Sequence, residues 1–134
     1  MRAWVYNRVL NLGWPTSWAN VGGKRVISSG SADQPKKPFL LVSMGVEQPP
    51  LGMPASSKTQ SIPFTVWVHD EPGSMVRIDD MAMLVKAELP TNVPFKIGNL
   101  SVYEVRWVET GDDAYDDHFM TNARPVRFSA MTRR

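Results

Sequence analysis

The alternation of apolar and other side chains over residues 61–69 constrains the fold of this chain more than any other feature. The even-numbered residues 62–68 are all apolar, whereas Thr65 and Trp67 alternate with them. A period of two places successive side chains on opposite faces of a β-strand, so this stretch predicts a strand with one buried face. Pro63 lacks an amide donor, so we expect this end of the strand to lie at a sheet edge or to be unpaired.

A turn and a helix are predicted directly after this strand. Pro72-Gly73 lies at the centre of a turn over residues 69–73. We expect Ser74 to cap a helix over Ser74–Leu89 that ends before Pro90. The apolar positions of this helix recur at helical spacing and predict its buried stripe: Ile78, Met81, Leu84, Val85 and Leu89.

Three further strands are predicted. Residues 38–44 form a continuous apolar run between Pro38 and Gly45, which is typical of a strand buried on both faces. The other two strands cover residues 102–109, with Tyr103, Val105 and Trp107 on one side, and residues 121–131, with Val126, Phe128 and Ala130 on one face. The last residues, 131–134, are basic and are expected to fray.

The order of elements predicts the fold class. Residues 1–12 are apolar at helical spacing and predict an N-terminal helix, and residues 14–33 read as an irregular connection with a short strand possible at 25–28. A length of 134 residues corresponds to one domain. We therefore expect a single α+β domain over residues 1–134, with a mainly antiparallel four-stranded sheet and two helices packed on one face.

Composition excludes several classes of site. The chain has no cysteine and two histidines, which excludes disulfides, thiolate metal sites, cysteine nucleophiles and three-histidine centres. Its net charge of +2 is too near zero to indicate a dedicated nucleic-acid or membrane-surface protein. Asn7 and Arg8 interrupt the N-terminal apolar residues, so no signal peptide is expected, and no apolar run approaches the length of a membrane span.

An acidic cluster near the C-terminus is the one candidate for a metal or acid–base site. It comprises Asp112, Asp113, Asp116 and Asp117, with His118 adjacent. Hard cations prefer several oxygen ligands, and a metal-dependent hydrolase could use such a cluster. The spacing of an EF-hand is absent, however, and runs of like charge are typical of solvated loops. The solvated loop is the favoured interpretation.

Two other motifs invite a catalytic interpretation and are better explained structurally. His69-Asp70-Glu71 could tune a general base, but the chain has no nucleophile elbow, and turn residues before a helix explain the same stretch. Val21-Gly22-Gly23-Lys24 lacks the spacing of a phosphate-binding loop. We therefore expect no catalytic residue and no cofactor.

Two features favour an assembly subunit. Five tryptophans in 134 residues is a high number, and Trp14, Trp18 and Trp67 fall in a predicted loop or on the outer face of a strand, where large aromatic residues often anchor protein contacts. Residues 45–60 are rich in proline and cannot form regular structure, so we expect a long flexible loop after the first core strand. Leu51 and Met53 give this loop apolar side chains.

Three blocks of this sequence resemble tail terminator proteins of long-tailed phages, especially those of actinobacterial hosts. The blocks are PFLLVSMGVEQP, VWVHDEPGSMVRIDDM and VRWVETGDDAYDDHFMT, and the similarity runs from about Pro38 to Phe128. The resemblance implies an α+β fold and a homo-hexameric ring that caps the tail tube, ends its polymerisation and joins the head. It also implies that residues 45–60 form a loop that becomes ordered in the ring, and it carries over no catalytic residue or cofactor.

The resemblance sets the expected partners and location. These are the major tail tube protein and a head-completion (stopper) protein at the neck of the virion, with genomic DNA passing through the ring without sequence-specific contacts and no membrane. Another head–tail joining subunit, such as a head-closure or tail-completion protein, remains the main alternative. The candidate assembly interface comprises Leu51, Met53, Trp67, His69, Asp112, Asp113, Asp116 and Asp117.

Overall fold

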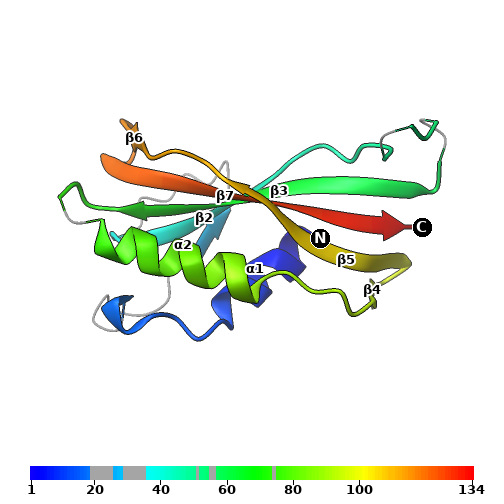
Figure 1. Cartoon of the computed structure of the whole chain (residues 1–134), viewed down its shortest axis with the longest axis horizontal. Coiled ribbons are helices and arrows are strands. Elements are labelled where there is room, and N and C mark those ends of the chain that lie inside the picture. The colour runs from blue at the N-terminus through cyan, green and yellow to red at the C-terminus, as the bar shows by residue number, and fades with distance from the viewer. Residues whose placement is uncertain (19–25, 29–35, 51, 55–56, 74) are drawn as a thin grey trace.

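The computed structural model describes residues 1–18, 26–28, 36–50, 52–54, 57–73 and 75–134. Within these residues the chain forms two α-helices, one short 3₁₀ helix and seven strands (Figure 1). The helices are α1 (Arg2–Leu10), the 3₁₀ helix η1 (Thr16–Trp18) and α2 (Val76–Glu88). The strands are β1 (Val26–Ser28), β2 (Phe39–Met44), β3 (Thr59–Asp70), β4 (Phe95–Ile97), β5 (Leu100–Thr110), β6 (Ala114–Asp116) and β7 (Thr121–Arg133).

The class is α+β, as predicted, but the sheet is mixed and larger than the four antiparallel strands expected. The order of its strands is β1-β2-β3-β7-β5-β4. The short strand β6 is not on this path and pairs with the first residues of β7, before the part of β7 that pairs with β5. All described strand pairs are antiparallel except β1 with β2, which is parallel. The short strand that the sequence made possible at residues 25–28 is present as β1, whereas β4 and β6 were not predicted, because their three residues are too few to show a period of two.

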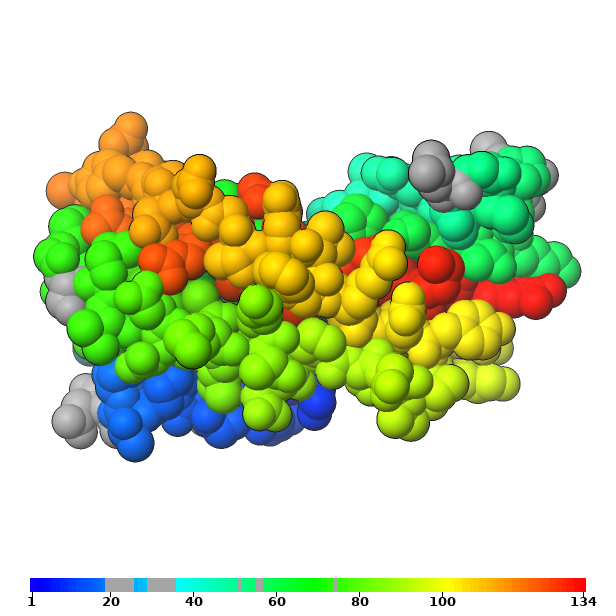
Figure 2. Space-filling model, viewed as in Figure 1, coloured from blue at the N-terminus to red at the C-terminus, as the bar shows by residue number. Residues whose placement is uncertain are grey.

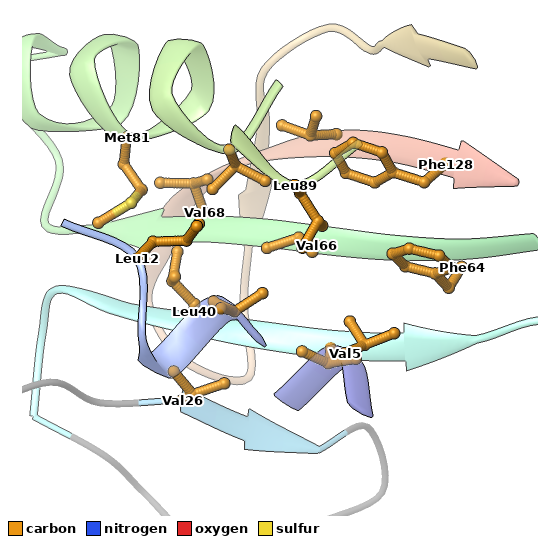
Figure 3. Close-up of a cluster of buried hydrophobic side chains, with 14 of the residues drawn as sticks. Val5, Leu12, Val26, Leu40, Phe64, Val66, Val68, Met81, Leu89 and Phe128 are labelled. Atoms are coloured by element: carbon orange, nitrogen blue, oxygen red, sulfur yellow. The ribbon is translucent and has the colours of Figure 1, made fainter. Parts of the chain in front are cut away.

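Both helices cover the same face of the twisted sheet, as predicted (Figure 1). The even-numbered residues 62–68 of β3 are buried on this face, which confirms the alternation that defined the strand. They pack with Val5 of α1 and with Met81 of α2 in one apolar cluster, shown in Figure 3. Burial of this cluster, at about 25 cal/mol per Å² of apolar surface, is the main source of stability for a domain of this kind.

The strand β2 is buried on both faces only over its first half. Leu40 and Val42 belong to the cluster under the helices, whereas Phe39 points to the opposite face and is also buried. Leu41 and Ser43 are half-buried, so the prediction of burial on both faces holds for the end next to Phe39.

Two register shifts interrupt β5, and the first of them overturns the predicted orientation of Tyr103. The register moves from Val102↔Thr132 to Glu104↔Met131, so Tyr103 is an extra residue, and a second shift occurs between Trp107 and Glu109. A bulge inserts one residue and breaks the period of two. Val102 and Val105 are consequently both buried, while Tyr103 and Trp107 are exposed to 43% and 37%. Val105 and Trp107 still share a face, as predicted, because they lie opposite Ala130 and Phe128 with no register shift between them, whereas the predicted orientation of Tyr103 is wrong.

Pro63 lies inside the sheet, opposite Ser129 of β7, and not at its edge. On its other side the pairing with β2 has ended at Met44↔Phe64, and the amide of Gly45 donates to the carbonyl oxygen of Pro63 at 2.7 Å. The N–H and C=O of one residue point to the same side of a strand, so the missing donor of Pro63 faces Gly45. The proline is tolerated because it lies just beyond the end of β2.

The ends of two elements differ from the prediction. The residue that caps α2 is Met75, without a side-chain cap, and the predicted cap Ser74 lies outside the described residues. Leu84 is half-buried, unlike Met81, which is inaccessible to solvent. The expected frayed tail belongs largely to β7, because Thr132 is buried between β3 and β5.

Candidate functional site

The acidic cluster is divided between ion pairs and turn contacts. Arg124 on β7 binds Asp113 through two of its nitrogens, at 2.7 and 3.1 Å, and Asp79 on α2 at 2.5 Å. The hydrogen bond to Asp113 is the largest cause that raises the pKa of Arg124 above its ordinary value. This network links the acidic loop to α2 across the edge of the sheet.

The remaining carboxylates of the cluster do not converge. Asp116 accepts main-chain hydrogen bonds from His118 at 2.9 Å and Phe119 at 3.1 Å, which closes the turn before β7. Asp112 and Asp117 are exposed. In the part of the chain that the structure describes, no three acidic or histidine side chains gather as a metal site. The solvated-loop interpretation fits this arrangement.

His69 lies in the interior of the fold. The prediction that it belongs to an exposed assembly interface is therefore wrong. Its side chain is 2% exposed, stacks on Phe39 at 4.6 Å between ring centroids, and shares a 2.7 Å hydrogen bond with the hydroxyl of Thr121. The ring of Phe119 packs edge-on against it at 5.5 Å. Burial lowers the pKa of His69 to about 4, although the nearby carboxylate of Asp116 acts in the opposite direction.

Asp70, the neighbour of His69, forms a structural ion pair. Its carboxylate receives two 2.9 Å hydrogen bonds from Arg77 and a 2.7 Å hydrogen bond from the amide of Glu71. Asp70 is almost fully buried, whereas the Arg77 side chain is 34% exposed. The pair fastens the end of β3 to the first turn of α2, which favours the structural interpretation of His69-Asp70-Glu71.

The tryptophans expected outside the core separate into different environments. Trp18 is 2% exposed and donates from Nε1 to the carbonyl oxygen of Arg77 at 2.8 Å, so the prediction that it lies outside the core is wrong. Trp14 is half-buried and donates from Nε1 to the carbonyl oxygen of Val9 at 3.0 Å. Trp67 lies on the face of β3 opposite the helices, as predicted, and is half-buried. Of these three, Trp14 packs against the apolar cluster and Trp18 is buried, so Trp67 is the one that keeps the predicted place outside the core.

The loop between β2 and β3 covers residues 45–58, shorter than the predicted 45–60 because β3 begins at Thr59, and it is anchored at its base. Gln48 and Ser61 exchange two main-chain hydrogen bonds of 2.8 and 2.6 Å, and Arg134 pairs with Glu47 at 3.1 Å. The loop projects beyond the helices at the end of the molecule where β7 finishes (Figure 1). Figure 2 shows its described residues as a separate projection at that end.

The tip of this loop is a turn that exposes an apolar side chain. The amide of Met53 donates to the carbonyl oxygen of Pro50 at 2.9 Å, and Gly52 adopts a φ of +83°, which favours glycine. Met53 is 47% exposed, as the interface prediction requires, and Val46 near the base is 77% exposed. Leu51, the other predicted apolar contact, lies outside the described residues.

An open groove beside β5 is a feature that the sequence did not predict. It has a volume of about 390 Å³ and is lined by Pro90, Thr91, Asn92, Glu104, Val105, Arg106 and Trp107. The ring of Trp107 also lies 4.0 Å from the ammonium of Lys86, measured to the ring centroid. The groove forms because β5 carries a bulge here and because the segment after α2 turns back to pair Thr91 with Val105. Neither event leaves a periodic signal in the sequence.

No helix among the described residues has the length and apolar character needed to cross a bilayer. No protein-family model matches the chain, and no curated protein sequence matches it. The fold does resemble solved structures. One of them, a protein without a functional name, matches 99% of this chain and 93% of its own length, with a TM-score of 0.65 and 18% sequence identity. At this identity the likeness establishes a shared fold alone.

Proposed function

We propose that this chain is a structural virion protein, a tail terminator that forms a hexameric ring on the end of the phage tail tube. The ring ends tube polymerisation and provides the surface that joins the head. The observation that carries the proposal is the anchored loop over residues 45–58, which presents an exposed apolar tip beyond the rest of the fold. Together with the three sequence blocks that resemble tail terminators, this tip favours a role in assembly and not in catalysis.

The physical reason is the balance between exposed apolar surface and loop entropy. An apolar tip that stays in water does not stabilise a monomer. Burial of the same tip against a partner contributes about 25 cal/mol of binding free energy per Å² of apolar surface. Ordering a long free loop costs about 1–2 kcal/mol per residue, but the base here is already fixed by hydrogen bonds and the prolines restrict the tip. The cost of binding through this loop is therefore lowered before any partner arrives.

The proposal also places the protein at the neck of the virion. Its partners there are the major tail tube protein on one side and a head-completion protein on the other, and genomic DNA passes through the ring without sequence-specific contact. A head-closure or tail-completion subunit would use the same kind of exposed loop. Binding to the tail tube protein favours the terminator, and binding only to head proteins favours this alternative.

Substitution of Met53 by aspartate tests the proposal. We expect Met53→Asp to leave the melting temperature nearly unchanged, because the side chain is exposed, and to give uncapped tails whose tubes exceed their normal length, because the new charge would be desolvated in the ring. Tube length is measured by electron microscopy of assembled tails. Met83→Asp is the matched control, since Met83 is 70% exposed on α2, and it should cap tails normally. Normal tube length with Met53→Asp contradicts the proposed role of the loop.

A further inference from the structure

A second, smaller group of buried side chains lies on the face of the sheet opposite the helices. Phe39 on β2 lies opposite His69 on β3, which in turn lies opposite Ala123 on β7. Residues directly opposite each other on paired strands share a face of the sheet. All three are buried, together with Thr121, and neither Phe39 nor Ala123 belongs to the apolar cluster under the helices. The titratable ring of His69 therefore lies in a small interior of its own.

A short turn between β6 and β7, over residues 117–120, covers this group. Its Phe119 packs edge-on against the ring of Phe39, at 5.1 Å between ring centroids, and against the ring of His69, at 5.5 Å. Thr121, the first residue after the turn, shares the 2.7 Å hydrogen bond with His69. Figure 1 shows β6 and the start of β7 at the end of the sheet away from the C-terminus. The histidine ring is thus covered by a turn and by the first residue of β7.

Local contacts hold this turn closed. The carboxylate of Asp116 accepts the amides of His118 and Phe119. From the segment before β2, the ammonium of Lys37 donates to the carbonyl oxygen of Met120 at 3.0 Å. Met120 adopts a φ of +56°, a left-handed conformation that crowds the Cβ and is uncommon for residues other than glycine. These contacts, together with the packing of Phe119 on the histidine ring, therefore hold the turn in an unfavourable backbone conformation.

The charges around the histidine ring do not compensate for its burial. The charged and titratable side chains on the adjoining segments are Lys37, Asp70, Asp116, Asp117 and His118. Asp70 is bound to Arg77, and Lys37 brings a positive charge to the turn. Asp116 favours protonation of His69, but burial outweighs this attraction and lowers the pKa of the ring to about 4. A proton on the ring is therefore disfavoured for as long as the turn covers it.

We propose that the turn over residues 117–120 is an acid-sensitive cover, which opens when His69 is protonated while the rest of the fold stays intact. In the open form the charged ring reaches water. Opening also uncovers Phe39, whose neighbours Leu41 and Trp67 are half-buried on the same face of the sheet. The main apolar cluster lies on the other face, so its packing is retained. Acid thus creates an apolar surface at one end of the sheet, whatever the role of the protein in assembly.

The pH dependence of opening follows from the pKa of His69 in the two forms. The ring has its ordinary pKa of 6.5 when the turn is open and a pKa of about 4 when the turn is closed. Above pH 6.5 the ring is neutral in both forms, so opening does not depend on pH. Below pH 6.5 opening becomes about tenfold more favourable for each pH unit, down to about pH 4. The equilibrium constant for opening is therefore about 50-fold larger at pH 4.5 than at pH 7.

The reactivity of a buried cysteine tests this opening, because the natural chain contains none. Ala123→Cys introduces a thiol at a position that is 2% exposed and lies opposite His69. Its rate of reaction with 4,4′-dithiodipyridine, divided by that of glutathione at the same pH, measures how often the site opens. We expect this ratio to rise about 50-fold from pH 7 to pH 4.5. In combination with His69→Phe, whose ring does not titrate, the ratio should change by less than about twofold.

Ala130→Cys is the matched control, because Ala130 lies on the same strand but is buried in the cluster under the helices. Its thiol reports unfolding of the whole domain and should react at least about tenfold more slowly than that of Ala123→Cys at both pH values, because local opening is easier than global unfolding.

Hydrogen exchange provides a second measurement on the chain without any cysteine. The amides of His118 and Phe119 should lose protection as the pH falls from 7 to 4.5, after correction for the intrinsic exchange rate, and should not do so to the same extent in His69→Phe. Equal rates for the two cysteine variants overturn the inference, because the opening would then be global. A rise in reactivity or exchange that persists in His69→Phe overturns it as well, because the histidine would then not control the turn.

Discussion

The buried histidine of this fold predicts a specific loss of stability in acid. His69 is 2% exposed, and burial lowers its pKa to about 4 from the ordinary 6.5. The unfolded chain therefore takes up a proton below pH 6.5, whereas the folded chain does not until about pH 4. Stability contributed by the neutral ring is complete above pH 6.5 and is lost as the pH falls towards 4.

The magnitude follows from the gap between the two pKa values. At about 1.4 kcal/mol for each pH unit, a fall from 6.5 to about 4 corresponds to a loss of about 3 kcal/mol in the free energy of unfolding. Small domains are stable by about 5–15 kcal/mol, so this is a large fraction of the total. Carboxylates also titrate in this range, and the effect of the histidine must be isolated by comparison with a variant.

Urea denaturation at pH 7.5 and pH 4.5 of the natural protein and of His69→Phe makes this comparison. Phenylalanine keeps an aromatic ring against Phe39 but cannot titrate or bond to Thr121, so it should cost about 1–3 kcal/mol at pH 7.5. We expect the free energy of unfolding of the natural protein, relative to that of His69→Phe, to be lower by about 2–3 kcal/mol at pH 4.5 than at pH 7.5. His118→Gln, at an exposed position, should keep the natural pH dependence. A difference in free energy of unfolding between the two proteins that is the same at both pH values would refute the reasoning.

Three further substitutions test the packing. Arg77→Ala leaves the carboxylate of Asp70 buried without its charged partner. We expect it to lower the free energy of unfolding, measured by urea denaturation, by about 3 kcal/mol. A decrease near zero would mean that water reaches the carboxylate. Met81→Ala should lower the free energy of unfolding by about 2–5 kcal/mol in the same assay, and Leu84→Ala should lower it clearly less, because Leu84 is only half-buried. Equal effects would contradict the observed orientation of α2, in which Met81 faces the sheet more fully than Leu84 does. Gly45→Ala should lower the melting temperature, because a Cβ there would lie 2.6 Å from the ring of the proline opposite it in β3, and an unchanged melting temperature would show that this ring can move.

The elements with strong periodicity could be predicted from the sequence. The central strand β3, the strand β7 and both helices lie where the apolar patterns place them, because each buries one face over nine residues or more. Of the three-residue strands, β1 lies within residues 25–28, where the sequence made a short strand possible, whereas β4 and β6 could not be predicted, because three residues are too few to show a period of two, although each forms a hairpin with the strand that follows it. The bulges in β5 could not be predicted either, because an inserted residue shifts the pattern without leaving a signal of its own.

The candidate interface was predicted less well than the fold. Composition identified the exposed loop tip with Met53, because apolar residues among prolines have no periodic face to bury. His69 was misplaced because the residues that cover it lie about 50 positions further along the chain, Phe119 in the turn before β7 and Thr121 at the start of β7. The groove beside Trp107 depends on tertiary pairing, and the sequence alone contains no pattern for it.

Negative-stain electron microscopy of the purified protein, alone and mixed with tail tubes, tests the central claim most directly. The account predicts a ring with six subunits at one end of each tube, and monomers or weakly associated species when tubes are absent. The number of subunits is read from the symmetry of end-on views. Tubes with bare ends at saturating protein, or a ring that binds only heads, would contradict the assignment of this chain as a tail terminator.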